Sequence, residues 1–305
     1  MSRRRKGSPV HGVVLLDKPP GLSSNQALQR VRRAFDARKA GHTGTLDPFA
    51  TGMLPCCLGE ATKTSAFLLD ADKAYRATAR LGVATSTGDL EGEAVEECQV
   101  PSLDRALIEA VLADFTGEIE QMPPMYSALK HEGRPLYEWA RQGVVVERKR
   151  RRVTIRGLRL LDWASPDLSF EVTCSKGTYV RTLAEDLARE LGTCAHLTAL
   201  RRLWVEPFRN RDMVTLEALE QAAGAGEAGR FLLPLDVGLE YWPLLRLAAE
   251  DTVRFSNGNP VPAELSHGGG VTGDWVRVES RDGVPLGLGE LDGGLVHPRR
   301  VYRLD

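Results

Sequence analysis

The sequence has 305 residues, 42% hydrophobic and 27% charged, an ordinary balance for a globular protein with a sizeable core. Its 40 lysines and arginines against 41 aspartates and glutamates give a net charge of -1, which argues against a nucleic-acid partner on bulk charge. No apolar run approaches the roughly 20 residues of a membrane-spanning helix. The basic N-terminus continues into Gly7-Ser8-Pro9 rather than into an apolar signal core, so a secreted or membrane protein is not expected.

The first elements are expected between residues 13 and 60. Residues 13–16 read as a buried strand, which a proline-rich turn closes. Ser23 or Ser24 is expected to cap a helix that Gly41 ends, because the apolar residues between them form one stripe at helical spacing. Residues 41–60 contain six glycines and prolines and are predicted to form a long irregular loop, a feature that is more often functional than idle.

The middle of the chain alternates strands and helices. Residues 73–81 alternate as a strand with Tyr75 on its apolar face, and Ser102 is expected to start a helix. That helix would turn five apolar residues inward: Leu103, Ala106, Leu107, Ala110 and Val111. A short helix is predicted between Pro135 and Gly143, followed by two strands near residues 153–155 and 168–174 and a helix at 182–192.

The C-terminal part has a different pattern. Residues 221–230 are small and poor in apolar side chains, so an exposed loop is expected there. From about residue 245, short alternating strands are separated by Asp282-Gly283 and by a second Asp-Gly-Gly turn at 292–294. These hairpin signals predict a small, separate all-β module.

Five cysteines are scattered along the chain and form no C-x-x-C pair. Their odd number and their spacing suit a reducing cytoplasm better than a disulfide framework, and no His or Cys pair has the spacing of zinc ligands. The sequence therefore predicts a cytoplasmic protein without a metal site. The cysteines are Cys56, Cys57, Cys98, Cys174 and Cys194.

Positive charge is concentrated in two segments. Residues 148–152 are an unbroken basic run, and five arginines and lysines crowd residues 30–39. Acidic residues gather elsewhere, at 89–97. Such runs are usually solvated faces, but they are also typical of phosphate contacts.

Two segments could carry chemistry. In residues 41–48, glycines allow close approach to a ligand, and Pro48 holds Asp47 extended with His42 nearby; the alternative is an ordinary Asp-Pro turn. In residues 175–181, Arg181 could bind a carboxylate or a phosphate, or could simply start a helix in solvent.

Tyr75 and Tyr179 could stack on a base, although tyrosines in strands are usually half-buried packing residues. The chain contains no G-x-S-x-G, P-loop or H-E-x-x-H motif.

Read together and in order, seven blocks of the sequence resemble the TruB family of tRNA pseudouridine-55 synthases over about residues 10 to 210. They are Asp17 to Ser24, Gly41 to Pro55, Gly59 to Lys63, Lys73 to Arg76, Pro123 to Ala128, Ser175 to Arg181 and Leu200 to Arg202.

The resemblance implies an α+β fold, in which a pseudouridine synthase domain with a central, mostly antiparallel sheet precedes a small all-β PUA-like domain. The expected division is a basic N-terminal arm at 1–9, a catalytic domain at 10–245 and an RNA-binding PUA-like module at 246–305. The implied activity is the isomerisation of uridine to pseudouridine at position 55 in the tRNA T-loop, by base flipping, with no metal or organic cofactor. The implied partner is the T-arm of tRNA, with no obligatory protein partner, for an enzyme that is a monomer.

The resemblance also assigns roles to residues. Asp47 matches the catalytic aspartate and Arg181 the arginine that pairs with it. Tyr75, also a catalytic candidate, and Tyr179 match the tyrosines that contact the flipped base. The other matching residues are assigned to substrate binding: Leu200 in the base pocket, His42 in the space that the base leaves, and Lys18 and Lys63 in supporting roles.

Three other functions compete with this interpretation. A guide-RNA-dependent pseudouridylase of the same family would need protein partners and terminal extensions. A non-catalytic RNA-binding protein would have no need of the intact Asp47. A glycosidase-like hydrolase would need a second acid beside Asp47, and the sequence indicates none.

Overall fold

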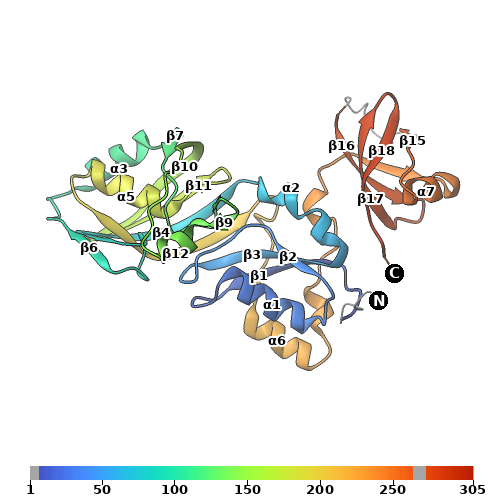
Figure 1. Ribbon diagram of the computed structural model, residues 1–305, viewed down its shortest axis with the longest axis horizontal. Coiled ribbons are helices and arrows are strands. Elements are labelled where there is room, and N and C mark those ends of the chain that lie inside the picture. The colour runs from blue at the N-terminus through green and yellow to red at the C-terminus, as the bar shows by residue number, and fades with distance from the viewer. Residues whose placement is uncertain (1–6, 264–272, 305) are drawn as a thin grey trace.

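The computed structural model describes residues 7–263 and 273–304 of the chain, and its largest feature is a nine-stranded sheet (Figure 1). Only the β1–β13 and β3–β12 pairs are parallel; the other pairs of this sheet are antiparallel, which confirms the predicted architecture. In spatial order the strands are β13 (Val214–Thr215), β1 (Gly12–Lys18), β3 (Thr51–Leu58), β12 (Ala195–Val205), β4 (Lys73–Leu81), β11 (Asp167–Cys174), β10 (Arg151–Ala164) and β7 (Gly117–Gln121), with β2 (Ala40–His42) paired to β3.

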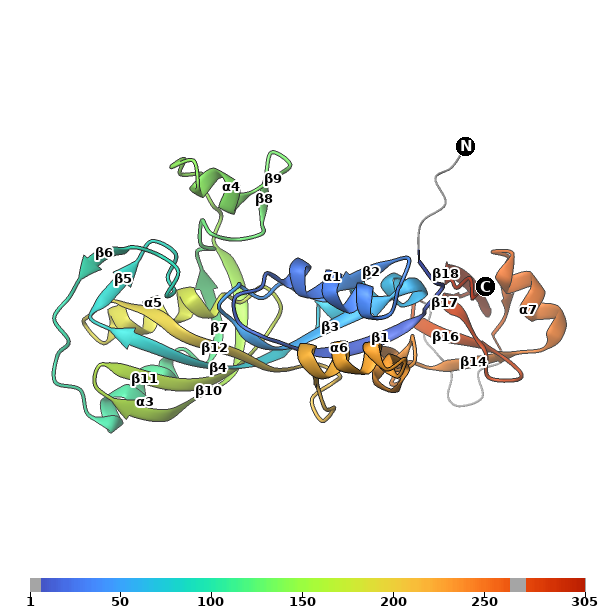
Figure 2. The same cartoon turned by 90° about the horizontal axis from the view of Figure 1, so that it is seen from below.

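Two pairs of helices cover the two halves of this long sheet (Figures 1 and 2). Helices α1 (Ser24–Ala34) and α6 (Leu216–Gly224) bury their apolar residues against β1 and β3. Helices α3 (Arg105–Asp114) and α5 (Val180–Glu190) pack at the other end, against β4, β10 and β11. The central strands β12 and β4 therefore lie where the two cores meet, and they carry residues of the site described below.

The remaining elements of this domain are short. A hairpin of β5 (Val83–Thr85) and β6 (Ala94–Glu97) follows β4. Between β7 and β10, Figure 2 shows a projecting segment that contains a second, smaller hairpin and one helix. The hairpin is formed by β8 (Lys130–His131) and β9 (Arg134–Pro135), and the helix is α4 (Leu136–Ala140). Another short helix, α2 (Ser65–Leu69), lies between β3 and β4. No helix within the described part of the chain is long and apolar enough to cross a membrane.

The helix α1 starts as the sequence predicts but ends earlier. Ser23 is the cap: its hydroxyl accepts a hydrogen bond from the backbone N–H of Gln26, whose side chain accepts one from Ser23 N–H in return. The helix ends at Ala34, followed by Asp36 at φ 46°, so the prediction that Gly41 ends it was wrong. Gly41 instead lies in β2.

The predicted irregular loop at 41–60 was also wrong, because β2 and β3 leave only residues 43–50 between them. The glycines and prolines that suggested a loop belong partly to a buried strand. Gly52 has φ 99°, and a Cβ on it would lie 2.1 Å from the carbonyl oxygen of Arg202, so glycine permits β3 to lie against β12. Pro55 is paired with Leu15 inside the sheet.

Two further predictions on helices need correction. Asp104, not Ser102, caps α3, and the buried side chains are Ile108, Val111 and Leu112, whereas Leu107 is 47% exposed. The later start shifts the inward stripe along the sequence. Residues 221–230 are not a loop, because α6 continues to Gly224 and a short 3-10 helix covers Ala228–Phe231.

The C-terminal module is a five-stranded sheet with the order β14 (Leu244–Leu247), β16 (Trp275–Ser280), β17 (Pro285–Asp292), β18 (Leu295–Val301) and β15 (Val261–Pro262). Both predicted hairpin turns are present, and one helix that the pattern did not indicate, α7 (Ala249–Ser256), packs on the sheet. The module contacts the first domain through aromatic rings, since Phe67 lies 4.9 Å from Trp242 and 4.8 Å from Trp275 between ring centroids. Of the predicted basic arm, residues 1–6 lie outside the described residues.

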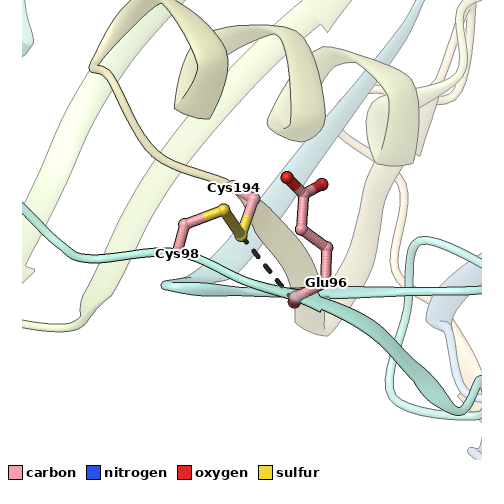
Figure 3. Close-up of side chains that lie close together, drawn as sticks. All are labelled: Glu96, Cys98 and Cys194. Carbon is pink, nitrogen blue, oxygen red and sulfur yellow. Dashed lines mark hydrogen bonds between the residues drawn. A yellow bond between two sulfur atoms is a disulfide. The ribbon is translucent and has the colours of Figure 1, made fainter.

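The cysteine prediction was wrong in one respect, because Cys98 and Cys194 form a disulfide (Figure 3). Cys98 follows β6 and Cys194 precedes β12, and the fold brings their Cα atoms to 5.8 Å, a distance typical of disulfides. The 96 residues between them hide this proximity in the sequence. Glu96 lies beside the pair, with its carbonyl oxygen 3.9 Å from Sγ of Cys194. The other three cysteines are free and buried.

Candidate active site

Asp47 lies on the loop between β2 and β3, and the turn after β1 holds this loop in place. The hydroxyl of Ser24 donates to the carbonyl oxygen of Leu46 at 2.9 Å and accepts from its N–H at 2.7 Å. Lys18 is fully buried and donates to the carbonyl oxygen of Pro48 at 3.1 Å, as does the N–H of Gly21 at 2.8 Å. Contacts on both sides of Asp47 therefore fix its backbone.

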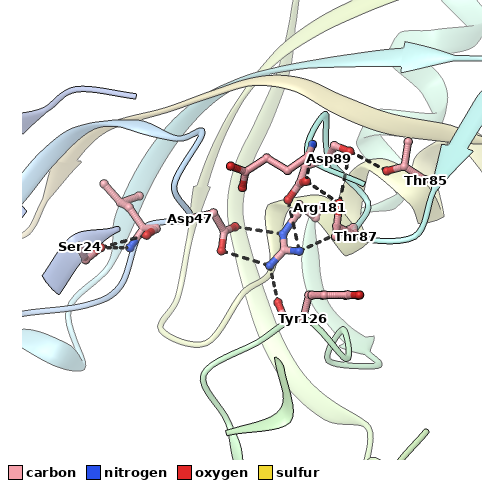
Figure 4. Close-up of polar contacts among 9 residues, drawn as sticks. Ser24, Asp47, Thr85, Thr87, Asp89, Tyr126 and Arg181 are labelled. Carbon is pink, nitrogen blue, oxygen red and sulfur yellow. Dashed lines mark hydrogen bonds and ion pairs between the residues drawn. The ribbon is translucent and has the colours of Figure 1, made fainter. Parts of the chain in front are cut away.

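Arg181 forms a bidentate ion pair with the Asp47 carboxylate (Figure 4). Its Nε lies 3.0 Å from Oδ2 of Asp47, and its Nη2 lies 3.2 Å from Oδ1. Because α5 begins at Val180, two residues before the predicted start, Arg181 sits in the first turn of that helix with a side chain only 4% exposed. The expected pairing of these two residues is present in the geometry.

Two other segments complete the surroundings of the Arg181 guanidinium. Its Nη1 donates to the carbonyl oxygen of Thr87 at 2.6 Å and lies 3.4 Å from Oδ2 of Asp89. Its Nη2 also donates to the carbonyl oxygen of Tyr126 at 2.7 Å. Arg181 thus joins the Asp47 loop, the hairpin between β5 and β6 and the segment after β7 in one buried network (Figure 4).

Asp89 is a site residue that sequence reasoning missed, since it counted only as part of an acidic cluster. Its carboxylate accepts hydrogen bonds from the Thr87 hydroxyl at 2.5 Å and from the N–H of Glu91 at 3.0 Å. Its side chain is 4% exposed, which is rare for an aspartate without a partner. The preceding Gly88 has φ 71°, and a Cβ on it would lie 2.5 Å from Oε1 of Glu185, but the sequence displays only the Gly-Asp pair.

Burial decides the ionisation of Asp47. It raises the pKa of the Asp47 carboxyl above its ordinary value, and the positive charge of Arg181 opposes this rise without cancelling it. The negative charge of Asp89 adds to the rise, while the positive charge of Lys18 opposes it. Burial and Asp89 therefore disfavour the ionised form of Asp47, and Arg181 and Lys18 favour it.

Beside Asp47 lies a cavity of about 330 Å³. Of the predicted site residues, Asp47, Tyr75, Tyr179, Arg181 and Leu200 line it, together with Lys73 and Arg202. Its volume is at the small end of the range for ligand pockets, which suits a single ring system. The sheet brings these residues together, because Tyr75 lies on β4, Leu200 on β12 and Tyr179 at the start of α5.

Tyr179 is held on two sides. The buried side chain of Gln121 accepts from the N–H of Tyr179 at 3.0 Å and donates to its carbonyl oxygen at 3.2 Å. The guanidinium of Arg151 lies 4.6 Å from the centre of the Tyr179 ring, a cation–π contact. Arg151 therefore supports a residue that lines the cavity, whereas the sequence placed it in an undivided basic run.

The other three predicted residues do not line the cavity. Lys18 lies beneath the Asp47 loop, where burial lowers its pKa to about 8. His42 lies in β2 opposite Cys56, and burial and the charge of Arg202 lower the pKa of its ring. Lys63 lies at the contact with the C-terminal module: it pairs with Glu60 and donates to the carbonyl oxygen of Val301.

Comparison with solved structures and with curated proteins gives the fold and the family. A chain of a crystal structure of a Cbf5-Nop10-Gar1 complex superposes with a TM-score of 0.73 at 26% identity, over 96% of this chain and 85% of that one. The tRNA pseudouridine synthase B of Chromohalobacter salexigens is 54% identical over 302 residues, 99% of this chain and 97% of the relative. That of Burkholderia mallei is 53% identical over 294 residues, 96% of this chain and 97% of the relative.

Family models match three consecutive parts of the sequence. The N-terminal domain of the TruB family pseudouridylate synthases matches residues 32–180, and the tRNA pseudouridylate synthase B C-terminal domain matches residues 181–240. A further C-terminal model, of pseudouridine synthase II TruB, matches residues 243–302, which span the small β module. With these matches and more than half of its residues shared with full-length relatives, the chain belongs to the TruB family of pseudouridylate synthases.

Proposed function

We propose that this chain isomerises uridine to pseudouridine at position 55 in the T-loop of tRNA, with Asp47 as the catalytic carboxylate. The observation that carries the proposal is the Asp47–Arg181 ion pair at the wall of a cavity that Tyr75 and Leu200 also line. A reactive carboxylate next to an aromatic ring fits a single base taken out of RNA. The relatives named tRNA pseudouridine synthase B support this class of substrate.

A uridine inside a stacked loop must leave the stack to reach Asp47, which costs about a few kcal/mol. Stacking on the pocket side chains offsets part of this cost. Tyr75 and Leu200 are each 8% exposed and contact the base, while Tyr179, held by Arg151 and Gln121, covers it. We assign His42, at the edge of the sheet in β2, to the space that the base vacates.

The reaction breaks the bond between C1′ and N1 and makes a bond between C1′ and C5. Asp47 adds to the ribose or to the base, or removes a ribose proton, and each of these routes requires its ionised form. The positive charge of Arg181 favours that form against burial. Burial raises the pKa of the Tyr75 phenol, so Tyr75 stays neutral at pH 7 and stacks on the base rather than accepting a proton.

The RNA backbone is assigned to the segment between β7 and β10, which projects from the domain in Figure 2. Exposed basic side chains lie along it, among them Lys130 and Arg141. Its root is tied to the catalytic pair, because the carbonyl oxygen of Tyr126 accepts from Arg181. Phosphate contacts of this kind orient an RNA without reading its sequence.

We further propose that residues 246–305 add to tRNA binding and that residues 10–245 contain the whole catalytic site. The strand β14 starts at Leu244, so the matching truncation is a chain that ends at Tyr241. It should bind tRNA more weakly and keep measurable activity. Lys63 and Glu60 would then be exposed, since they contact Val301 and Arg303 of the module.

The enzyme is proposed to act as a monomer in the cytoplasm, on tRNA and without a protein partner. Structural similarity to a chain from a Cbf5-Nop10-Gar1 complex raises the guide-RNA-dependent alternative. The identity of 26% to that chain against 54% to a tRNA pseudouridine synthase B favours the stand-alone enzyme.

The test uses an unmodified tRNA transcript, the wild-type chain and Asp47→Asn. The wild type should convert uridine 55 to pseudouridine, detected by mapping each modified position. Asp47→Asn should produce none and bind tRNA within about tenfold of the wild type, because most affinity comes from backbone contacts. Pseudouridine at another position only, or none at any salt concentration, would refute the proposal.

A further inference from the structure

Two buried cations, Arg202 and Lys73, line the same cavity as Asp47. Arg202 lies on β12 opposite Tyr75, and Lys73 is the first residue of the neighbouring strand β4; they are 1% and 7% exposed. Gly44 lies against both, since a Cβ there would be 3.6 Å from Nη1 of Arg202 and 3.8 Å from Cε of Lys73. The sequence blocks contained both residues without indicating a role for either.

Arg202 donates only to neutral oxygens. Its Nε donates to the carbonyl oxygen of Met53 at 2.6 Å, and its Nη2 donates to that of Gly44 at 3.2 Å. Within residues 7–263 and 273–304, no carboxylate forms an ion pair with it, and its further hydrogen bond is to the side chain of Tyr75, which lines the same cavity. The guanidinium therefore carries a positive charge that no ion-paired carboxylate of the described residues offsets.

Lys73 also donates to carbonyl oxygens rather than to a carboxylate. Its ammonium group donates to the carbonyl oxygens of Leu69 and Ala71, at 3.1 and 2.5 Å, and forms no ion pair within the described parts of the chain. Burial and the charge of Arg202 lower its pKa to about 8, against the smaller opposing effects of Cys174, Asp72 and Asp70, so Lys73 is mostly protonated at pH 7. Burying two cations side by side without an anion is unfavourable.

The catalytic carboxylate does not supply the missing negative charge. The charges that act on Asp47 are those of Arg181, Asp89 and Lys18, and Arg181 already binds it with two nitrogens. The cavity thus holds one cation for Asp47 and two more cations that face the space for the substrate.

The proposed reaction generates an anion in that space. When the C1′–N1 bond breaks, its electron pair stays on N1, and the uracil ring carries a negative charge spread over N1, O2 and O4. The ring turns, an electron pair at C5 forms the new bond to C1′, and the C5 proton leaves as N1 gains one. Atoms and charge balance, and the intermediate state is an anion that must be held without water.

We propose that Arg202, assisted by Lys73, binds the negative charge of the uracil ring between breakage of the C1′–N1 bond and formation of the C1′–C5 bond. This inference rests on the proposed function and adds a catalytic residue to it. Donors placed in advance where charge develops typically contribute about 10²–10³ in rate each. Tyr75, which is paired with Arg202 across the sheet and lines the same cavity, completes the pocket for this anion.

The test compares two tRNA transcripts, with uridine or with 5-fluorouridine at position 55. Fluorine withdraws electrons and stabilises the detached ring, so that ring depends less on protein cations. Single-turnover rates of loss of the original nucleoside are measured by digestion and chromatography, because fluorine at C5 prevents the last proton loss. Arg202→Met should lose about 100-fold with uridine and at least fivefold less with 5-fluorouridine.

Three controls separate this role from a structural one. Arg201→Met alters the neighbouring residue, which faces away and pairs with Asp17 at 2.7 Å, and should affect both transcripts equally. Lys73→Met leaves the contacts of Arg202 with Gly44 and Met53 intact and should show the same preference for 5-fluorouridine, at smaller size. Arg202→Lys, which keeps the charge, should recover part of the loss with uridine.

The outcomes are distinguishable. Equal losses with both transcripts in Arg202→Met and Lys73→Met, for variants that still bind tRNA, would mean that these residues only support the fold and would overturn the inference. If Arg202→Met fails to fold, Lys73→Met and Arg202→Lys alone decide the question by the same ratio. A wild-type chain that produces no pseudouridine 55 would instead refute the proposed function.

Discussion

Asp89 lies 3.4 Å from the same guanidinium that binds Asp47, on a side chain as buried as that of Arg181 itself. Two carboxylates thus share one cation in a place with little water. Asp89 anchors Arg181 and at the same time raises the pKa of Asp47 by its negative charge. These two effects can be separated experimentally, because one acts on the maximal rate and the other on its pH dependence.

We expect Asp89→Asn to lower the pKa of Asp47, since it removes a negative charge that raises it. The rate needs ionised Asp47 and rises with pH through this pKa, so the rise should move to lower pH. The maximal rate should fall about tenfold or more, because an amide nitrogen facing Nη1 of Arg181 misplaces the guanidinium. Single-turnover rates from pH 5 to 8 measure both.

The matched control is Glu93→Gln, an exposed residue of the same hairpin with no contact to Arg181. It removes one negative charge from the hairpin and should leave the profile in place. A profile of Asp89→Asn that coincides with that of the wild type would show that Asp89 does not act on Asp47.

The basic run at 148–152 divides into residues with different surroundings. Arg152 lies 3.4 Å from Glu118 and 3.9 Å from Glu120 on β7, whereas Arg150 is exposed and forms no ion pair with the described residues. Arg150→Ala should therefore weaken tRNA binding and reduce the log–log salt slope by about 0.7–0.9, and Arg152→Ala should change the slope less. Filter binding of tritiated tRNA over a series of salt concentrations compares the two slopes.

Neutralising Arg150, Arg151 and Arg152 together should flatten the slope further and also lower the rate at saturating enzyme. The added loss in rate comes from Arg151, which stacks on Tyr179 in the site. An unchanged slope in the triple variant would mean that the basic run is a solvated face that makes no phosphate contacts.

The disulfide between Cys98 and Cys194 should contribute to stability. It closes a long loop, and cross-links of this kind typically stabilise by about 2–4 kcal/mol. Reduction, or Cys98→Ser with Cys194→Ser, should lower the melting temperature. Thiol titration in denaturant should count three thiols before reduction, those of Cys56, Cys57 and Cys174, and all the cysteines after it. Five thiols in the untreated protein would contradict the cross-link.

The sequence was sufficient where structure follows from local patterns. Strand β4 has the predicted bounds of 73–81, because strict alternation over nine residues has no competing interpretation. Asp47 and Arg181 were named from motif blocks, and their ion pair is present. Each of these two residues lies in a short motif, and a single sequence is enough to recognise such a motif.

What could not be predicted depends on contacts across the sheet. Asp89 reaches Arg181 because its hairpin lies against β12, where Asp89 bridges to Leu197. Cys98 meets Cys194 by the same packing. The direction in which the pKa of Asp47 moves also depends on the fold, since burial outweighs Arg181 only once the cavity is formed. In each case the partner is distant in sequence and no local pattern marks it.

The last prediction concerns Arg181 itself. Arg181→Met removes the charge that opposes burial at Asp47, so the pKa of Asp47 should rise further and its rate profile should move to higher pH, opposite to Asp89→Asn. Loss of the bidentate ion pair should also reduce the rate by about 10² or more at neutral pH, with partial recovery as the pH rises. tRNA affinity should change little, because this guanidinium is buried and donates only within the protein. Single-turnover rates at saturating enzyme from pH 5.5 to 9 give the profile. A uniformly lowered profile without a shift would mean that Arg181 positions the loop alone, and a large loss of affinity with an unchanged profile would mean that it binds a phosphate.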